Sequence, residues 1–298
     1  MNAYLDSDVG YLLGLLVARG EMLTEPSPRL IIHFPLATLA AQGEHHIYST
    51  QESIRLGVFQ VRERLLHLMG EDALIVDDKN DSIDLVFHFT RNTLVLRNIS
   101  ALLGGKSHYL AYSVPQALFH APLEVKREFV RGFADVAGNV RPANRDQAGL
   151  HRVRLDVLNG NWRLPVQLCL LLQEHLKVPV PNIIWGHPNM GREWREHQVN
   201  VYADDFLQVG FSVPFKQQAL KELAEANQLL GRSPPSGCPG ERRLRARKPP
   251  DFAVGDVAHL PPELQGKRFD AYWQICHALG CPRRPPAGQR HLLTEEPE

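Results

Sequence analysis

Two apolar segments that each end in glycine constrain this chain more than any other feature. Residues 8–20 (DVGYLLGLLVARG) predict a helix, with Asp8 as its expected N-cap and Gly20 as its expected stop. Residues 123–138 (LEVKREFVRGFADVAG) predict a second helix that also ends in glycine. The first segment is apolar on almost every side, and such a helix must be buried, so we expect this pair in the core.

The elements predicted after each of these helices follow one order. After the first helix we expect a strand at 29–37, a helix at 51–70, a strand pair at 73–78 and 82–89, and a final helix at 92–104. After the second helix we expect a strand at 151–159, a helix at 162–176, a strand pair at 182–188 and 197–205, and a final helix at 214–231. The pattern α-β-α-β-β-α therefore occurs twice, which indicates an internal structural repeat. It predicts an α+β fold of two pseudosymmetric half-domains, residues 1–121 and 122–231, with curved antiparallel sheets.

Composition sets wide limits. The chain has 298 residues and a formal net charge of zero, which neither requires nor excludes a nucleic-acid partner. The N-terminal residues lack the pattern of a secretory signal, and no apolar run is long enough to span a bilayer. We expect no membrane partner, and a soluble, cytoplasmic protein with reduced thiols.

Residues 232–298 differ from the rest and predict a Pro/Arg-rich C-terminal extension with one short helix at 267–280. Its basic run 242–248 could lie along DNA phosphates or simply solubilise a linker. The extension also holds Cys238, Cys276 and Cys281. These could form a small structural zinc site, although free buried thiols are the more common arrangement.

The two glycine helices resemble the paired signature motifs of single-chain LAGLIDADG homing endonucleases. The first motif reads LLGLLVARG and the second VRGFADVAG, and the segment VGFSVPFKQQAL (209–220) is similar to a late segment of the family's repeat. Glycine occupies the third and ninth positions of both motifs, as Gly14, Gly20, Gly132 and Gly138. The resemblance covers roughly residues 5–231.

The resemblance implies a fold and a partner. Gly14 and Gly132 would let the two helices approach closely at a pseudo-dyad, and Gly20 and Gly138 would let the chain leave each helix in a left-handed conformation. Each half would present a sheet to the major groove of double-stranded DNA. One chain would act as a monomeric pseudo-dimer.

The chain departs from the family where that resemblance implies metal binding. The eighth motif position is an acid in the family and helps to hold Mg²⁺ over the scissile phosphates, but it is Arg19 and Ala137 here. Arginine repels a cation and alanine has no ligand atom. Glu21 is the better candidate for a displaced magnesium ligand and catalytic acid. Asp135 is the weaker one, because it lies two residues, about 200° around the helix, from Ala137.

Basic side chains on and near the predicted strands are the candidates for DNA contact. Arg152 and Arg154 share one face of a strand with Asp156, and Asn200, Tyr202 and His33 are further donors of a suitable type. For any single residue a solvated sheet face is the simpler explanation. The candidates are Arg141, Arg145, Arg152, Arg154, Arg192, Arg195, Lys216, Arg242, Arg243, Arg245, Arg247 and Lys248.

Three functions remain open on the sequence. The chain is a sequence-specific DNA-binding protein with impaired cleavage, an active metal-dependent endonuclease that uses Glu21, or a structural or interaction module on the same fold. The missing motif acids favour the first of these.

Overall fold

The computed structural model describes residues 4–25, 27–69, 74–89, 93–142, 150–158, 163–180, 182–188 and 195–229. The fold is α+β, as the sequence predicts, with two four-stranded antiparallel sheets of order β1-β2-β4-β3 and β5-β6-β8-β7. We call them sheet A and sheet B. The zinc candidates Cys238, Cys276 and Cys281, the basic run 242–248 and the helix expected at 267–280 lie outside the described residues.

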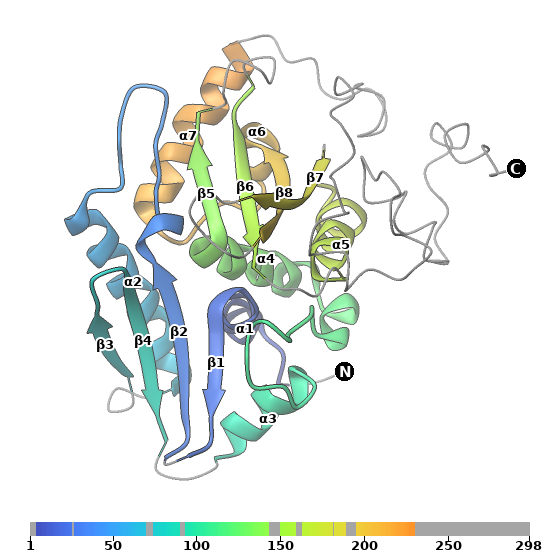
Figure 1. Cartoon of the computed structure of the whole chain (residues 1–298). Helices are drawn as coiled ribbons and strands as arrows, with labels where there is room; N and C mark the ends of the chain where they lie inside the picture. The colour runs from blue at the N-terminus through green and yellow to red at the C-terminus, as the bar shows by residue number, and fades with distance from the viewer. Residues whose placement is uncertain are drawn as a thin grey trace, which may run out of the picture.

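The two sheets are built from elements in the same chain order (Figure 1). The first set is α1 (Ser7–Arg19), β1 (Gly20–Leu23), β2 (Arg29–Pro35), α2 (Gln51–Met69), β3 (Leu74–Asp78), β4 (Ser82–His88) and α3 (Leu94–Leu102). The second set is α4 (Leu123–Ala137), β5 (Gly138–Arg141), β6 (Arg152–Val157), α5 (Arg163–Leu170) with a π-helical turn (Leu171–His175), β7 (Asn182–Pro188), β8 (Arg195–Tyr202), α6 (Ala203–Phe206) and α7 (Pro214–Leu229).

The strands β1 and β5 were absent from the sequence prediction. Each is four residues long and begins at the residue after a motif helix, so it merges with the helix in the apolar pattern. The repeat is therefore α-β-β-α-β-β-α rather than α-β-α-β-β-α. Because β1 and β5 pair with β2 and β6, they place the residues that follow each motif directly on a sheet.

Helix α1 is buried from Val9 to Arg19, as its uniformly apolar sequence predicts. Its N-cap is Asp6, whose carboxylate accepts a hydrogen bond from the Val9 amide at 2.9 Å, and not Asp8 as expected. Helix α4 is amphipathic and buries Val125, Phe129 and Phe133. Both helices lie in the centre of the molecule, between the two sheets (Figure 1).

Backbone contact between α1 and α4 depends on two glycines. A Cβ atom on Gly14 would lie 2.1 Å from the Phe129 carbonyl oxygen, and one on Gly132 would lie 2.2 Å from the Tyr11 carbonyl oxygen. Real Cβ atoms do not approach so closely, so any other residue would force the helices apart. The predicted packing role of Gly14 and Gly132 matches this geometry.

Gly20 and Gly138 act differently from the prediction. Both are extended, with φ of −105° and −90°, so the expected left-handed exit from the helix is wrong. Glycine fits there because the chain turns directly into a strand against the last helical turn. A Cβ on Gly138 would lie 2.5 Å from the Ala134 carbonyl oxygen, and one on Gly20 would lie 2.6 Å from Leu16 Cα.

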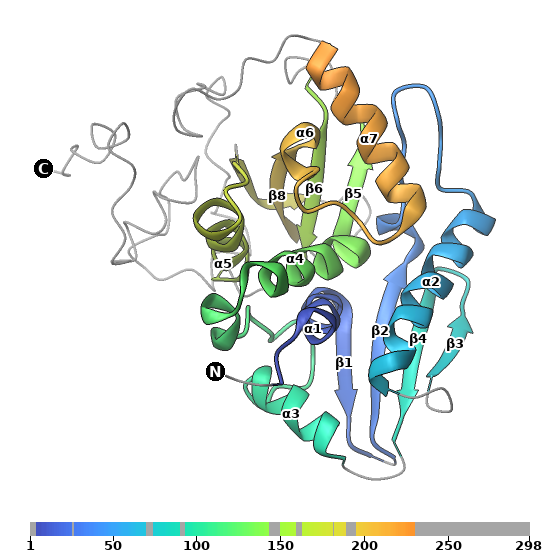
Figure 2. The ribbon, with the colours of Figure 1, turned by 180° about the vertical axis from the view of Figure 1, so that it is seen from behind.

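Helices cover one face of each sheet. Seen from behind, α2 lies over β4 and contacts β3, and α7 lies beside β5 (Figure 2). The inner faces bury Leu30, Ile32 and Phe34 of β2 and Val153, Leu155 and Val157 of β6. The alternate residues of these strands form the outer faces, which we name by sheet.

Other chain segments pair with β1 and β5, the strands at one edge of each sheet. Residues 107–109 pair with β1, where the Met22 amide donates to the Ser107 carbonyl oxygen at 2.7 Å. A loop from the first half reaches β5, where the Gln42 amide donates to the Val140 carbonyl oxygen at 2.9 Å. The same loop contacts α7 through the His45 amide and Glu222 (2.7 Å). None of the helices in the described ranges has the length and apolar character needed to cross a membrane.

The helix contact gives a direct test. We expect Gly14→Ala to lower the free energy of unfolding by about 3 kcal/mol, at the upper end for an overpacked core, because the new methyl group meets backbone. Gly105→Ala is the control: Gly105 has open space around it and φ of +71°, so only local strain of about 1 kcal/mol is expected. Urea denaturation of both variants measures the difference, and equal losses would contradict the close contact.

Candidate nucleic-acid interface

The outer face of sheet A carries a cluster of charged side chains. His33 on β2 lies between two carboxylates, with Nε2 3.3 Å from Glu21 Oε1 and Nδ1 3.0 Å from Asp84 Oδ1. His108 Nε2 lies 3.0 Å from the same oxygen of Glu21, and Lys79 forms an ion pair with Asp84. The cluster therefore joins β1, β2, β4 and the segment that pairs with β1.

The surroundings of His33 favour its charged form. Burial by itself would lower the pKa of His33, but the hydrogen bonds and charges of Asp84 and Glu21 outweigh it and raise the pKa. Burial would likewise raise the pKa of Asp84, yet its bonds to His33 and Lys79 lower it. Both ring nitrogens face carboxylate oxygens, which only accept hydrogen bonds, so the imidazolium satisfies this geometry best.

Neither of the two positions at which the resemblance implies an acid lies free at a surface. The Arg19 side chain is buried, and its Nη1 donates to the Ala18 carbonyl oxygen at 2.6 Å at the end of its own helix. Its guanidinium carbon also lies 5.7 Å from the centre of the Tyr109 ring. Ala137 is fully buried. These two positions serve packing and helix capping.

The residues around Glu21 do not fit a magnesium site. Mg²⁺ requires a near-octahedral set of oxygen ligands, whereas the Glu21 oxygen that faces this cluster is in contact with two imidazole rings. Asp84, the other carboxylate of this cluster, is paired with His33 and Lys79. Within the described ranges, no group of three or more His, Cys, Asp or Glu side chains could hold a metal ion.

Asp135, the second catalytic candidate, is fully buried and cannot reach a substrate. It accepts a hydrogen bond from the Tyr11 hydroxyl at 2.7 Å, and others from the backbone amides of Ser212 and Val213 at 3.1 and 3.3 Å. Burial raises its pKa to about 6, even though these bonds favour the carboxylate. Asp135 joins α1, α4 and the segment before α7. Its role is therefore structural, and the prediction of a catalytic acid is wrong.

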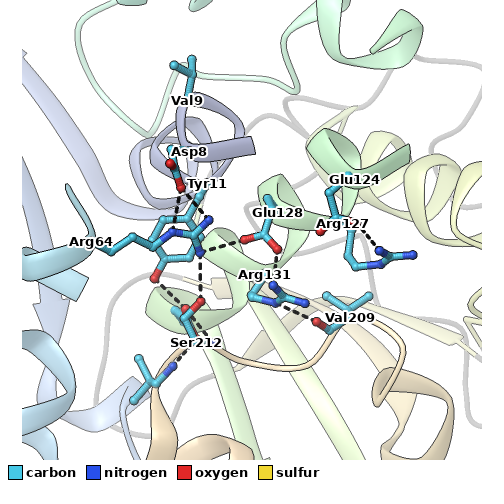
Figure 3. A network of polar contacts seen from close by, with 12 residues as sticks. Asp8, Val9, Tyr11, Arg64, Glu124, Arg127, Glu128, Arg131, Val209 and Ser212 are labelled. Atoms are coloured by element: carbon cyan, nitrogen blue, oxygen red, sulfur yellow. Dashed lines mark hydrogen bonds and ion pairs between the residues drawn. The ribbon is translucent and has the colours of Figure 1, made fainter. Parts of the chain in front are cut away.

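An arginine that the sequence did not single out links the same elements (Figure 3). Arg64 of α2 lies 2.9 Å from Asp8 and 2.8 Å from Glu128, and donates to the Ser212 hydroxyl at 3.2 Å. Its guanidinium carbon lies 3.9 Å from the centre of the Tyr11 ring, in a cation–π arrangement. Charged residues on an amphipathic helix usually face solvent, which is why Arg64 gave no sequence signal.

Lys216, predicted to contact DNA, lies in the core. Its ammonium group is fully buried and donates to three backbone carbonyl oxygens, those of Ala134 (3.2 Å), Asp135 (2.7 Å) and Gly138 (2.8 Å). Burial lowers the pKa of Lys216 to about 7. The lysine caps the C-terminal end of α4, where a positive charge is favoured by the helix dipole. The prediction of a DNA contact is therefore wrong for this residue.

The outer face of sheet B is polar along β5, β6 and β8. Asp156 Oδ1 lies 2.9 Å from Arg154 Nε and its carboxylate also accepts from the Asn139 amide, while the guanidinium carbon of Arg152 lies 5.3 Å from the centre of the Tyr202 ring. The residues of this face on β5, β6 and β8 are Asn139, Arg141, Arg152, Arg154, Asp156, Gln198, Asn200 and Tyr202.

Strand register shows how the two outer faces differ. Residues paired across neighbouring strands form rows, and one such row begins at the residue after Gly20 or Gly138. It consists of Glu21, Ile31 and Val86 in sheet A, and of Asn139, Arg154 and Asn200 in sheet B. The next row outward is Leu23, Arg29 and His88 in sheet A, and Arg141, Arg152 and Tyr202 in sheet B. Sheet B thus has hydrogen-bonding side chains where sheet A has three apolar ones.

The structure brings together three of the predicted DNA-contacting residues. Arg141, Arg152 and Arg154 share one edge of the outer face of sheet B. Arg195 begins β8, and nothing is described of its side chain. The remaining candidates, Arg145, Arg192 and the run Arg242, Arg243, Arg245, Arg247 and Lys248, lie outside the described residues.

Comparison with known proteins gives limited similarity. No family model matches the chain. A probable translation initiation factor IF-2 of Methanocaldococcus jannaschii is 24% identical over 161 residues, which are 50% of this chain but 13% of that protein. The chain thus spans about an eighth of the length of that relative, and the whole factor's activity says nothing about this chain.

Solved structures of two homing endonucleases are distantly similar. I-DmoI in complex with DNA and Mn has 13% sequence identity and a TM-score of 0.42, with 68% of this chain and 95% of that chain covered. The LAGLIDADG meganuclease I-CpaMI bound to uncleaved DNA has 11% identity and a TM-score of 0.38, with 74% and 91% covered. Similarity of this size does not carry over what those proteins bind.

The cluster on sheet A predicts a measurable histidine titration. The pKa of His33 is raised in the folded state, so His33 contributes stability at low pH that is lost as the pH rises through the folded pKa. We expect Asp84→Asn to lower the pKa of His33, as followed by NMR of the ring protons. Asp81→Asn, which changes an exposed carboxylate three residues away, is the control. An unchanged titration in Asp84→Asn would contradict the ion pair.

The core lysine predicts a large loss of stability. Lys216→Ala leaves three carbonyl groups without their donor and Asp135 without a nearby positive charge, so we expect a loss of about 3–5 kcal/mol. Lys221→Ala, on the exposed side of the same helix, should change stability by less than about 0.5 kcal/mol. Chemical denaturation compares the two, and equal stabilities would place the Lys216 ammonium at the surface.

Proposed function

We propose that the chain is a sequence-specific double-stranded DNA-binding protein with a LAGLIDADG homing endonuclease fold and impaired cleavage. In this proposal residues 1–121 and 122–231 are two half-domains related by a pseudo-dyad at the α1–α4 contact, and one chain binds one duplex as a monomer. Residues 232–298 form an extension. The protein is then DNA-associated, and the outer faces of the two sheets lie in the major groove.

The composition of the outer face of sheet B is the observation that carries this proposal. Arginine donates two hydrogen bonds to guanine, and asparagine or glutamine exchanges two with adenine, so these are the side chains that read base edges in the major groove. Arg152, Arg154, Gln198 and Asn200 alternate with core residues on two paired strands. Arg152, Gln198 and Asn200 are at most 7% exposed, so the proposal requires this face to open before it enters the groove. An antiparallel strand pair of this kind fits the groove, which is about 12 Å wide.

Impaired cleavage is supported by the residues at the motif ends. Arg19 and Ala137 replace the acids implied by the resemblance, and Asp135 is enclosed in the core. An active enzyme would need Glu21 to exchange its imidazole contacts for a cation, next to a cluster that already holds Lys79 and His33. A metal cation could bind Glu21 only by displacing these positive groups, which is unfavourable. Glu21 is therefore a weak substitute for the missing motif acids.

Duplex binding and cleavage can be tested together. We expect full-length protein to retain random-sequence duplex at low salt, to enrich a preferred sequence over rounds of selection, and to make no double-strand breaks with Mg²⁺ or Mn²⁺. Arg154→Ala should weaken binding to the selected site about tenfold, as loss of one bidentate base contact costs about 1–3 kcal/mol. Lys221→Ala, on α7 behind sheet B, is the matched control with the same loss of charge.

The outcomes separate the three functions. Absence of any retained duplex at low salt would exclude both DNA-binding functions, since phosphate contacts alone give non-specific binding there. Metal-dependent breaks that disappear in Glu21→Gln would establish the active endonuclease. Equal effects of Arg154→Ala and Lys221→Ala would show that sheet B does not read sequence.

A further inference from the structure

The outer face of sheet A is apolar at its centre. Strands β2 and β4 are the two inner strands of this sheet (Figure 1). Ile31 of β2 and Val86 of β4 are register partners on the outer face, and both side chains are half-buried; we call them the apolar pair. The face of an antiparallel sheet that points away from the core usually carries polar side chains. The apolar pair therefore offers an unusual contact for apolar groups of a partner.

Polar side chains surround the apolar pair. On the outer face its neighbours along β2 are Arg29 and His33, and its neighbours along β4 are Asp84 and His88. His88 is exposed and Arg29 is half-buried, so this part of the face is accessible. An apolar centre within a polar rim is the usual arrangement of a binding surface.

The carboxylates of this face are paired with positive groups. Glu21 Oε1 lies 3.0 Å from His108 Nε2 and 3.3 Å from His33 Nε2. Asp84 forms an ion pair with Lys79, and its Oδ1 lies 3.0 Å from His33 Nδ1. Because each acid is compensated by its own neighbours, the face does not present unpaired negative charge to a polyanion such as DNA.

Arg29 adds a hydrogen-bonding group beside the apolar pair. Its Nε atom has no hydrogen-bond partner within the described part of the chain. Guanidinium groups bind phosphate oxygens and guanine edges through paired hydrogen bonds. Arg29 is two residues from Ile31, a separation of about 7 Å along a strand, which is about two base-pair steps of DNA. One duplex can therefore contact Arg29 and the apolar pair at the same time.

Thymine is the base whose major-groove edge carries an apolar group, its C5-methyl. Side chains of register partners have Cβ atoms about 5 Å apart, so two branched side chains form a shallow apolar seat of methyl size. We propose that the apolar pair, Ile31 and Val86, reads thymine methyl groups, so that sheet A recognises a thymine-containing half of the bound duplex. This inference rests on the proposed function and names what one of its two surfaces recognises.

Sheet B differs at the same register positions. Arg154 and Asn200 occupy there the places of Ile31 and Val86. Arginine and asparagine read bases through hydrogen bonds, whereas isoleucine and valine can read them only through apolar contact. The two halves of one binding site are therefore distinguished by different chemistry, and removal of thymine methyl groups should affect only one of them.

Deoxyuridine tests this directly, because uracil differs from thymine only by the absence of the methyl group. Full-length protein is titrated with its selected duplex, in which thymine is replaced by uracil in one half at a time, and binding is followed by fluorescence anisotropy. We expect about fourfold weaker binding for each contacted thymine, in one half only, as burial of one methyl-sized group is worth about 0.8 kcal/mol. 5-Bromouracil, whose bromine fills the volume of the methyl group, should restore the affinity.

The failures of the two proposals are distinguishable. Equal affinity of the thymine and uracil duplexes in both halves, or a selected site without thymine, would overturn methyl reading while DNA binding stands. The apolar pair would then be left for a protein partner. Absence of duplex binding for every sequence at low salt would instead overturn the proposed function.

Protein variants assign the effect to the apolar pair. We expect Ile31→Ala to weaken binding to the thymine duplex about fourfold and to leave binding to the uracil duplex unchanged. Val86→Thr, which exchanges a methyl group for a hydroxyl at nearly constant volume, should act in the same direction if Ile31→Ala folds poorly. Leu56→Ala, at an exposed apolar position of α2, is the control and should keep the full difference between the duplexes. Full sensitivity to uracil in both Ile31→Ala and Val86→Thr would overturn the assignment.

Photocrosslinking locates the contact without any substitution in the protein. The unmodified full-length protein is irradiated with duplex that carries 5-bromouracil in the sensitive half, and cross-linked peptides are identified by mass spectrometry. We expect peptides that contain β2 or β4. Cross-links confined to peptides from β5, β6 or β8 would place the methyl contact on sheet B and overturn the inference.

Discussion

The direct backbone contact between α1 and α4 determines the arrangement of everything else. Because Gly14 and Gly132 have no side chains, the carbonyl oxygens of Phe129 and Tyr11 can lie 2.1 and 2.2 Å from the positions that Cβ atoms would occupy. Each helix continues directly into the first strand of a sheet, so the helix separation also sets the separation of β1 and β5. Both outer faces begin at these strands. The absence of side chains at Gly14 and Gly132 therefore sets the position of the candidate interface.

Buried polar groups fix this contact in one orientation. Tyr11 and Asp135 join the two helices, and Arg64 adds Asp8, Glu128 and Ser212 to the same network (Figure 3). Apolar packing between two helices tolerates sliding, but hydrogen bonds with defined partners do not. A partly buried ionic network need not raise stability over an apolar one, and its better attested role is to select one arrangement. Here it selects the register of the two halves.

The sequence predicted the elements with long periodic patterns and missed those without them. Helices α1, α2, α4 and α7 and the paired strands lie close to their predicted ranges, since periodicity reports burial directly. Strands β1 and β5 were missed because four residues after a helix contain no period. The roles of Lys216 and Asp135 were misjudged for a related reason: residue type indicates charge, but burial follows from tertiary contacts. The apparent catalytic acid and DNA-binding lysine are adjacent groups in one core network.

The loop that reaches from the first half to the edge of sheet B has a consequence for the evolution of this architecture. Gln42 pairs with Val140, and His45 with Glu222, so one half completes the sheet edge of the other. A β-strand edge without a partner invites association with other chains. Separate expression of the two halves would expose such an edge at β5 and favour either re-association of the fragments or aggregation. The chain is thus better suited to divergence of its two faces within one polypeptide than to fission into two subunits.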